Sequence, residues 1–471
     1  MPSLNKLPTE IVDRILKHLR PLDELPHPSQ ETENAGAWDI RHSARTLSAV
    51  ARTCRALHPI AERVLYSRYE IRFRKPLPGF AWKLATDETL QTALRRIDVL
   101  HDGINVPSEG NTQDSSYSPS VELRRVVQQA PNLRRFFMDA DHKAYVAMNE
   151  PSWLRPIITA ARMNLEGQNH NDAYSMLHTI DVQLHIKVVP SLLYLFALPK
   201  LRKLSLKSAI FGPSIGITWP QVPTTSRVTT LELQGEAKGS VEWILRMIRC
   251  CRTLYCFSAN TSHEGQPSGS SLQWSTDILA ALYRHKDTLT VLALGPCSDD
   301  SFDNLDRHYK RLEGFEAFSA LKALKVPFPL LMGRPKGRLI SDGHFVPDSH
   351  RDWTGYPVMR HVLPPKLSTL SLTLGDTFSP GRDYEHILLD LVPEAATDDA
   401  GLTLHTLNVA YSWLDDNDIF PLNFWTLEDK LVRRGCSFKY ILMFDDDASK
   451  TTPISTFLSS ILKSLTTRQW A

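Results

Sequence analysis

The sequence lacks the features of several large protein classes. No run of about 18 apolar residues occurs in this chain of 471 residues, so we expect no transmembrane helix. The first residues, MPSLNKLPTE, do not combine a charged start with an apolar core, so we expect no secretory signal. These absences predict a cytoplasmic and/or nuclear protein without a membrane partner.

Cysteine is scarce, and its spacing does not fit a metal site. The chain has 6 cysteines, which are expected to be reduced thiols when no signal sequence is present. Cys250, Cys251 and Cys256 form a cluster, but there is no CxxC pair, and His263 has no partner at zinc-finger spacing. We therefore predict buried structural cysteines, no metal ion and no other cofactor.

Neither sign of charge is in large excess. Lys and Arg number 54 against 52 for Asp and Glu, which gives a net charge of +2, and the two signs are interspersed. This balance predicts no nucleic-acid partner. The nearest thing to a basic cluster follows the N-terminal helices, and we expect it to be a solvated strand edge: Arg68, Arg72, Arg74 and Lys75.

Motifs of the common enzyme classes are largely missing. The chain contains no G-x-x-x-x-G-K-[ST], no G-x-G-x-x-G and no H-E-x-x-H. Residues 212–216, GPSIG, fit the G-x-S-x-G pattern after an apolar strand, but Pro220 and Pro223 follow where that motif requires a helix. We predict that the protein is not an enzyme, with an α/β hydrolase that uses Ser214 as the alternative.

Two N-terminal stretches predict three short helices. In LPTEIVDRILKHL, residues 7–19, apolar residues recur at a period of 3.6 and Pro8 fits the first helical turn. In the stretch 43–66 the apolar positions are spaced i, i+3, i+4 and i+7 until His58, and Pro59 then opens a third helix. Three helices of this length are too small to bury a core alone.

This pattern of residues resembles an F-box. The resemblance implies a trihelical module that binds a Skp-type adaptor and thereby joins a cullin-RING ubiquitin ligase. The chain departs from the family in its polar loop 21–42 and in the missing aromatic residue near Leu57. Carried over by position, the adaptor-binding residues are Leu7, Pro8, Glu10, Ile11, Ile15, Leu16, Leu47, Val50, Cys54 and Leu57, the last four shared with helix packing. The alternative is that the helices only cap the domain that follows.

Beyond residue 68 the sequence repeats. Tyr69, Ile71 and Phe73 alternate with polar residues and predict a strand. A pattern apolar-x-x-apolar-x-apolar then occurs eleven times, with its first residues at Leu94, Leu133, Leu177, Leu201, Val228, Leu254, Leu289, Leu321, Leu367, Leu404 and Phe438. Each triad predicts a short strand, and the residues between them contain helical segments, for example at Ile244 and Ile278.

The triads also resemble a leucine-rich repeat. This resemblance implies an α/β solenoid, a ladder of parallel strands with helices on its outer side. The units start 24 to 46 residues apart, wider than the family's roughly 20–29, and an ordinary parallel α/β domain is the alternative. We predict an F-box domain at 1–68 and the solenoid at 69–471, with a long insertion at 333–366 and a closing helix at 453–465.

Together the two resemblances imply a substrate receptor. The F-box would bind the adaptor, and the solenoid would hold an unidentified target protein. A stand-alone binding scaffold without a ligase is the alternative. The insertion is the longest interruption of the repeat and is rich in the residue types that dominate interfaces, so we predict target binding by Arg334, Arg338, Trp353, Tyr356 and Arg360. The alternative is that the insertion is a tolerated surface loop without a binding role.

Overall fold

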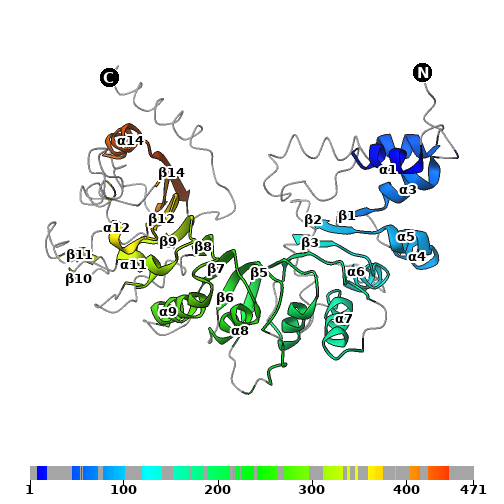
Figure 1. Ribbon diagram of the computed structural model, residues 1–471, viewed down its shortest axis with the longest axis horizontal. Coiled ribbons are helices and arrows are strands. Elements are labelled where there is room, and N and C mark those ends of the chain that lie inside the picture. The colour runs from blue at the N-terminus through cyan, green and yellow to red at the C-terminus, as the bar shows by residue number, and fades with distance from the viewer. Residues whose placement is uncertain are drawn as a thin grey trace, which may run out of the picture. The chain divides into compact units, whose positions relative to one another are not determined.

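The computed structural model shows an α/β fold made of repeated strands and helices (Figure 1). It describes residues 8–18, 45–52, 55, 57–72, 78–100, 119–139, 152–168, 172–184, 188–212, 216, 218–222, 224–237, 241–262, 270–295, 311–332, 337–339, 345–347, 359–374, 388, 404–413 and 423–444. Over these residues the strands form a twelve-stranded sheet in the order β1-β2-β3-β4-β5-β6-β7-β8-β9-β12-β13-β14. Two compact units divide the chain, essentially between β5 and β6. The predicted boundary at residue 68 therefore lies inside the first unit.

The first unit begins with three helices and continues with five strands. The helices are α1 (Thr9–His18), a helical segment 45–52 and α3 (His58–Leu65). The strands are β1 (Arg68–Arg72), β2 (Arg96–Leu100), β3 (Arg135–Asp139), β4 (Thr179–Gln183) and β5 (Lys203–Phe211). Their connections contain α4 (Pro78–Thr86), α5 (Glu88–Ala93), α6 (Pro119–Gln128), α7 (Arg155–Leu165) and the 3-10 helix η4 (Pro190–Ala197). Each strand from β1 to β5 pairs in parallel with the next.

The second unit repeats this scheme with seven strands of the same sheet. They are β6 (Thr230–Ala237), β7 (Cys256–Ser262), β8 (Val291–Leu294), β9 (Ala323–Pro327), β12 (Thr369–Leu374), β13 (Thr406–Trp413) and β14 (Ser437–Phe444). Between them lie α8 (Glu242–Cys250), α9 (Ser270–Leu282), η5 (Tyr283–His285), η6 (Phe315–Ala317), α11 (Phe328–Met332), α12 (Met359–Val362) and α14 (Asn423–Arg433). The predicted apolar helix residues Ile244 and Ile278 are buried on α8 and α9.

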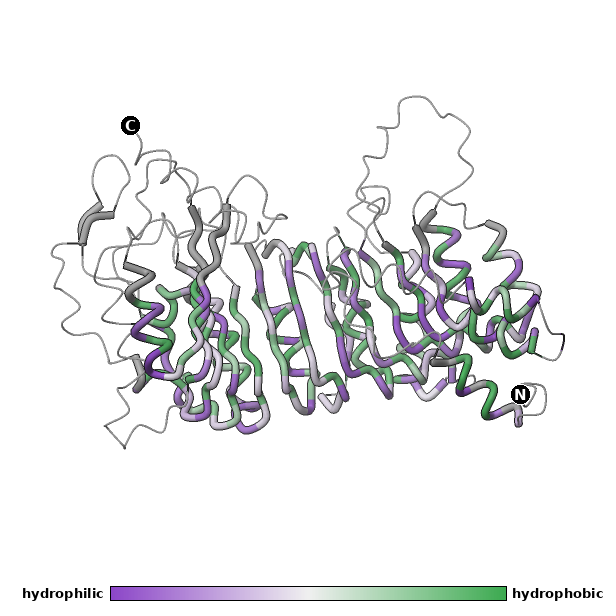
Figure 2. The backbone as a smooth tube through the Cα atoms, turned by 90° about the horizontal axis from the view of Figure 1, so that it is seen from above, coloured by the Kyte–Doolittle hydropathy of each residue, from purple (hydrophilic) through white to green (hydrophobic). Residues whose placement is uncertain are grey.

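The apolar triads form the core, as the sequence predicts. In the first unit Ile97, Phe136, Ile180 and Leu204 occupy one row of paired positions and are all buried. Figure 2 shows strands of each unit running side by side, with apolar and polar residues interspersed along them. Helices α4 to α7 lie along one side of the strands β1 to β5 (Figure 1). This arrangement confirms the α/β class and the parallel ladder.

The last triad is assigned to the wrong register by the sequence. The pattern predicts Phe438 as its first residue, but Phe438 pairs with Leu407, the middle residue of the preceding triad. Ile441 and Met443 then pair with Ala410 and Ser412 instead of with triad residues. The assignment is displaced by three residues, and a displacement by an odd number of residues moves a side chain to the other face of the strand.

The insertion at 333–366 contains regular structure. β10 (Gly337–Leu339) and β11 (Phe345–Pro347) form a separate antiparallel pair, and α12 follows near the end of the insertion. Val362 is buried, so this part of the insertion packs against the unit. The predicted loop 21–42, residues 73–75 and the predicted closing helix 453–465 lie outside the described residues.

Candidate functional site

The three N-terminal helices pack around a small apolar core. Its buried members are Val12, Leu16, Leu47, Leu57, Ala61 and Val64. The His58 ring lies 2.9 Å from the carbonyl oxygen of Ala51 and joins the helical segment 45–52 to α3. The core draws on all three helices, so they form one module, which we call the three-helix module.

Helix α1 carries a second apolar stripe that this core leaves uncovered. Val12 and Leu16 are buried, whereas Ile11 and Ile15 each expose 41% of their surface. These two isoleucines are four residues apart and therefore lie on one side of the helix, and Pro8 at its start is exposed as well. We call Pro8, Ile11 and Ile15 the α1 edge.

The structure thus divides the predicted adaptor-binding residues. Leu16, Leu47 and Leu57 are buried in the module, which gives them a packing role. Val50 is partly buried against the same core, and Glu10 is exposed beside the α1 edge. Leu7 and Cys54 lie outside the described residues. An adaptor contact remains a prediction for the residues at the surface.

The module is tied to the ladder through α4. Lys83 Nζ lies 3.1 Å from both Glu62 Oε1 and the Tyr66 hydroxyl oxygen. The hydrogen bond with Tyr66 raises the pKa of Lys83, with a further contribution from Glu62, although partial burial acts in the opposite direction. Phe80 stacks on Tyr69 with ring centroids 3.6 Å apart. These contacts connect α3, α4 and β1.

A buried ionic network crosses the first strands. Arg68, Arg96 and Asp98 have side chains at most 2% exposed, and the Nε atoms of the two arginines lie 2.6 and 2.7 Å from Asp98 Oδ2. Burial is the largest cause that lowers the pKa of Arg96, and the charge of Asp98 opposes it. The expectation that Arg68 belongs to a solvated edge is therefore wrong, because the neighbouring strand supplies a carboxylate that allows its burial.

A second buried carboxylate lies on β4. Asp181 is 1% exposed and has Lys207 Nζ at 3.2 Å from Oδ1 and Lys203 Nζ at 3.7 Å from Oδ2. Lys207 also lies over the Phe137 ring, 5.8 Å from its centroid. In the strand register Asp98, Phe137, Asp181 and Ser205 are successive partners. This row is buried, and Asp181 holds the partly exposed ammonium groups of Lys203 and Lys207 in place beside it.

Basic residues recur in pairs where the strands of the first unit begin. The pairs are Arg95-Arg96 at β2, Arg134-Arg135 at β3 and Arg202-Lys203 at β5. Within the described residues the buried Nε atoms of Arg134 and Arg135 have no hydrogen-bond partner. Burial is the largest cause that lowers the pKa of Arg95, and the nearby positive charge of Arg134 is the second. We call these six residues the basic strip. In the sequence each pair stands between the first and the middle apolar residue of a triad, a pattern that could have predicted the strip.

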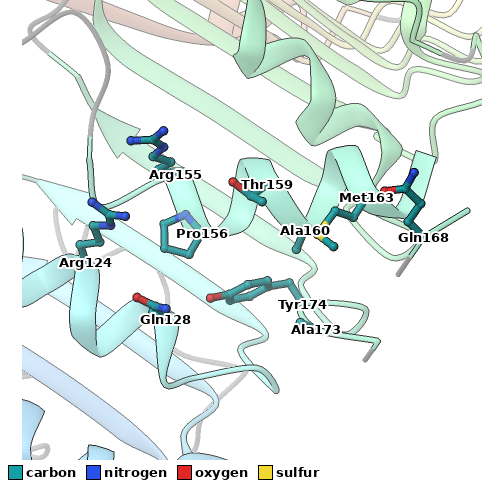
Figure 3. Close-up of a pocket in the computed structure, with 10 residues that line it drawn as sticks. All are labelled: Arg124, Gln128, Arg155, Pro156, Thr159, Ala160, Met163, Gln168, Ala173 and Tyr174. Atoms are coloured by element: carbon teal, nitrogen blue, oxygen red, sulfur yellow. The ribbon is translucent and has the colours of Figure 1, made fainter. Parts of the chain in front are cut away.

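A groove lies between α6 and α7 (Figure 3). Its volume is about 530 Å³, and its lining residues are Arg124, Gln128, Arg155, Pro156, Thr159, Ala160, Met163, Gln168, Ala173 and Tyr174. The Tyr174 ring is buried, and its hydroxyl donates a 2.7 Å hydrogen bond to the carbonyl oxygen of Val127. Sequence patterns do not reveal this groove, because its residues come from two helices and a loop.

The remaining predicted sites are only partly described. Arg338 lies on β10 and Arg360 on α12, whereas Arg334, Trp353 and Tyr356 lie outside the described residues, as does Ser214. Target binding by the insertion stays a prediction. Cys250 and Cys251 are buried free thiols, as predicted, and Cys256 is partly exposed.

Comparison with known proteins does not assign the chain. No family model matches it, and no curated protein matches its sequence. In the described part of the chain we find no helix with the length and apolar character needed to cross a membrane. The same residues contain no group of three or more His, Cys, Asp or Glu side chains placed to hold a metal ion.

Proposed function

We propose that this protein is a substrate-receptor subunit of a cullin-RING ubiquitin ligase. In this proposal the three-helix module is an F-box that binds a Skp-type adaptor, and the repeat is a degenerate leucine-rich-repeat solenoid that holds a target protein. The chain itself performs no bond chemistry, and it works in the cytoplasm, the nucleus or both.

The observation that carries the adaptor half of the proposal is the α1 edge. The core of the module is already closed by Val12, Leu16 and their neighbours. Ile11 and Ile15 therefore do not contribute to that core, yet they place two large apolar side chains at the surface. An apolar patch that packing does not require is typical of a protein-binding site. Pro8 and Ile11 are also positions on which the F-box resemblance rests.

The target half of the proposal is supported by the charged face of the first unit. Repeat ladders offer an extended surface for protein partners. Here the buried carboxylates of Asp98 and Asp181 hold neighbouring cations in place. Within the basic strip, Arg134 and Arg135 form no ion pair with any of the described residues. A fixed surface with excess positive charge favours a target segment that is acidic.

The test measures capture of a purified Skp-type adaptor by the full-length protein. Replacing both Ile11 and Ile15 by alanine should weaken binding at least tenfold, because truncation of an interface anchor costs on the order of 2 kcal/mol. The matched control is Val432→Ala, another exposed aliphatic residue, on α14. It should leave binding unchanged.

Circular dichroism of the double variant should match that of the wild type, since neither isoleucine belongs to the core. Undiminished adaptor capture by the double variant would refute the F-box assignment. A wild-type protein that captures no adaptor would instead favour the stand-alone scaffold.

A further inference from the structure

The groove between α6 and α7 has a basic end. Arg124 on α6 and Arg155 on α7 lie at this end with Gln128 (Figure 3). Both arginines are exposed, and within the described residues neither forms an ion pair or a side-chain hydrogen bond. Helix α7 begins at the same place, and its first turn has no acidic residue and no side-chain cap. Two guanidinium groups and a positive helix end favour an anion here.

Beyond this end, the α7 wall of the groove carries apolar residues. The lining residues Pro156, Ala160 and Met163 belong to α7. Met163 exposes 38% of its surface, which is high for a large apolar side chain. Methionine adapts its shape to different apolar partners. A ligand with an anionic group beside an apolar side chain fits both parts of the groove.

The floor of the groove is held in one conformation. Tyr174 has a φ angle of +59°, which is rare for a residue with a side chain. Its backbone N–H donates a 2.7 Å bond to the carbonyl oxygen of Pro131, and its hydroxyl bonds Val127. Asp172, two residues earlier, also has a positive φ of +46°. Strained residues that their surroundings hold in place cluster at binding sites, and a preformed floor lowers the entropy cost of binding.

The polar groups of the groove suit a peptide. Gln128 and Gln168 lie among its lining residues, and Thr159 lies on the α7 wall. Each of these side chains can both donate and accept hydrogen bonds, as a peptide backbone requires. The volume of about 530 Å³ is within the range of roughly 300–1,000 Å³ known for ligand sites.

We infer that this groove binds a short peptide segment of a partner protein, in which a carboxylate or phosphorylated side chain stands next to a large apolar side chain. The anion lies between Arg124 and Arg155, and the apolar side chain lies against Met163 and Tyr174. This inference deepens the target-binding half of the proposed function and rests on it.

The test uses the full-length protein and an array of synthetic pentapeptides. The central residue is glutamate, phosphoserine, glutamine or lysine, and the next residue is leucine, isoleucine, phenylalanine or serine. The wild type should retain peptides with an anion beside an apolar residue at least tenfold better than the other combinations. Comparison of glutamate with phosphoserine identifies the anion.

Three variants locate the binding. The double change Arg124→Gln and Arg155→Gln should lower retention of the anionic peptides at least tenfold, and Thr159→Trp should block the groove without changing its charge. Arg162→Gln is the matched control, since Arg162 lies on α7 outside the groove. It should bind like the wild type. Equal retention by the double variant, or a wild type that retains neither the glutamate nor the phosphoserine peptides better than the glutamine peptides, would overturn the inference.

Adaptor capture by the same variants separates the two proposals. The groove variants should still capture the Skp-type adaptor, and the Ile11 and Ile15 variant should still retain the peptides. If the wild type shows the peptide preference but captures no adaptor, the ligase function is wrong and the groove remains. If the wild type captures the adaptor but shows no peptide preference, the groove inference is wrong and the ligase function remains.

Discussion

At the scale of single residues, the buried carboxylate of Asp98 joins the first two strands of the ladder. It accepts hydrogen bonds from the Nε atoms of both Arg68 and Arg96. Desolvation of such charges is costly, and it is tolerated because each charge has a close partner. Loss of the carboxylate would leave two buried guanidinium groups without their shared acceptor.

We expect Asp98→Ala to lower the free energy of unfolding by about 3–5 kcal/mol, the usual cost of breaking a buried pair. The control is Glu166→Ala, which removes the exposed partner of Arg162, 3.7 Å away. That change should cost less than about 1 kcal/mol, as surface pairs do. Urea unfolding of both variants provides the measurement. Equal losses in the free energy of unfolding would show that Asp98 contributes no more to stability than a surface carboxylate does.

At the scale of an element, the turn between α14 and β14 sets the register of the last strand. Gly435 has a φ of +81°. Its N–H bonds the carbonyl oxygen of Val432 at 2.9 Å, and the N–H of Cys436 bonds that of Leu431 at 3.0 Å. This pair of bonds ends a helix at a left-handed residue. The strand that follows starts at Ser437, so Phe438 takes the middle triad position.

Gly435→Ala should therefore lower the free energy of unfolding by about 1–2 kcal/mol, because a β-carbon disfavours the left-handed conformation. Gly435→Asn should cost less, since asparagine visits this conformation more readily. Both values come from urea unfolding. An alanine variant as stable as the wild type would indicate that the turn rearranges freely.

At the scale of the whole molecule, the three-helix module and the first strands belong to one unit. Lys83 on α4 contacts Glu62 of α3 and the Tyr66 hydroxyl, and Phe80 of α4 stacks on Tyr69 of β1. Removal of the module should therefore affect the ladder as well as the proposed adaptor contact.

Deletion of residues 1–66 should increase amide hydrogen exchange in β1 and β2, because it removes both hydrogen-bond partners of Lys83 and uncovers α4. The Ile11 and Ile15 double variant should leave exchange in these strands unchanged, so it is the better test of adaptor binding. Unchanged exchange after the deletion would show that the ladder is stable without the module.

The sequence by itself determined the repeated strands and much of the helical pattern. Ten of its eleven triads predict strands in the right register, because two positions of each must be buried and a strand alternates its faces with a period of two. The helices around Ile244 and Ile278 follow from a period of 3.6 in the same way. Such local patterns can be recognised in the sequence because they mark which side of a helix or strand packs against the core.

Only the tertiary structure decided which polar groups act together. Arg68 is buried because Asp98 stands thirty residues later on the neighbouring strand. The groove joins Arg124, Arg155 and Tyr174, which come from three separate segments. The α1 edge is visible only when packing has buried Val12 and Leu16 and left Ile11 and Ile15 outside. Contacts between segments that are far apart in the chain produce no periodic pattern in the sequence. Only the folded structure shows which of these polar groups interact.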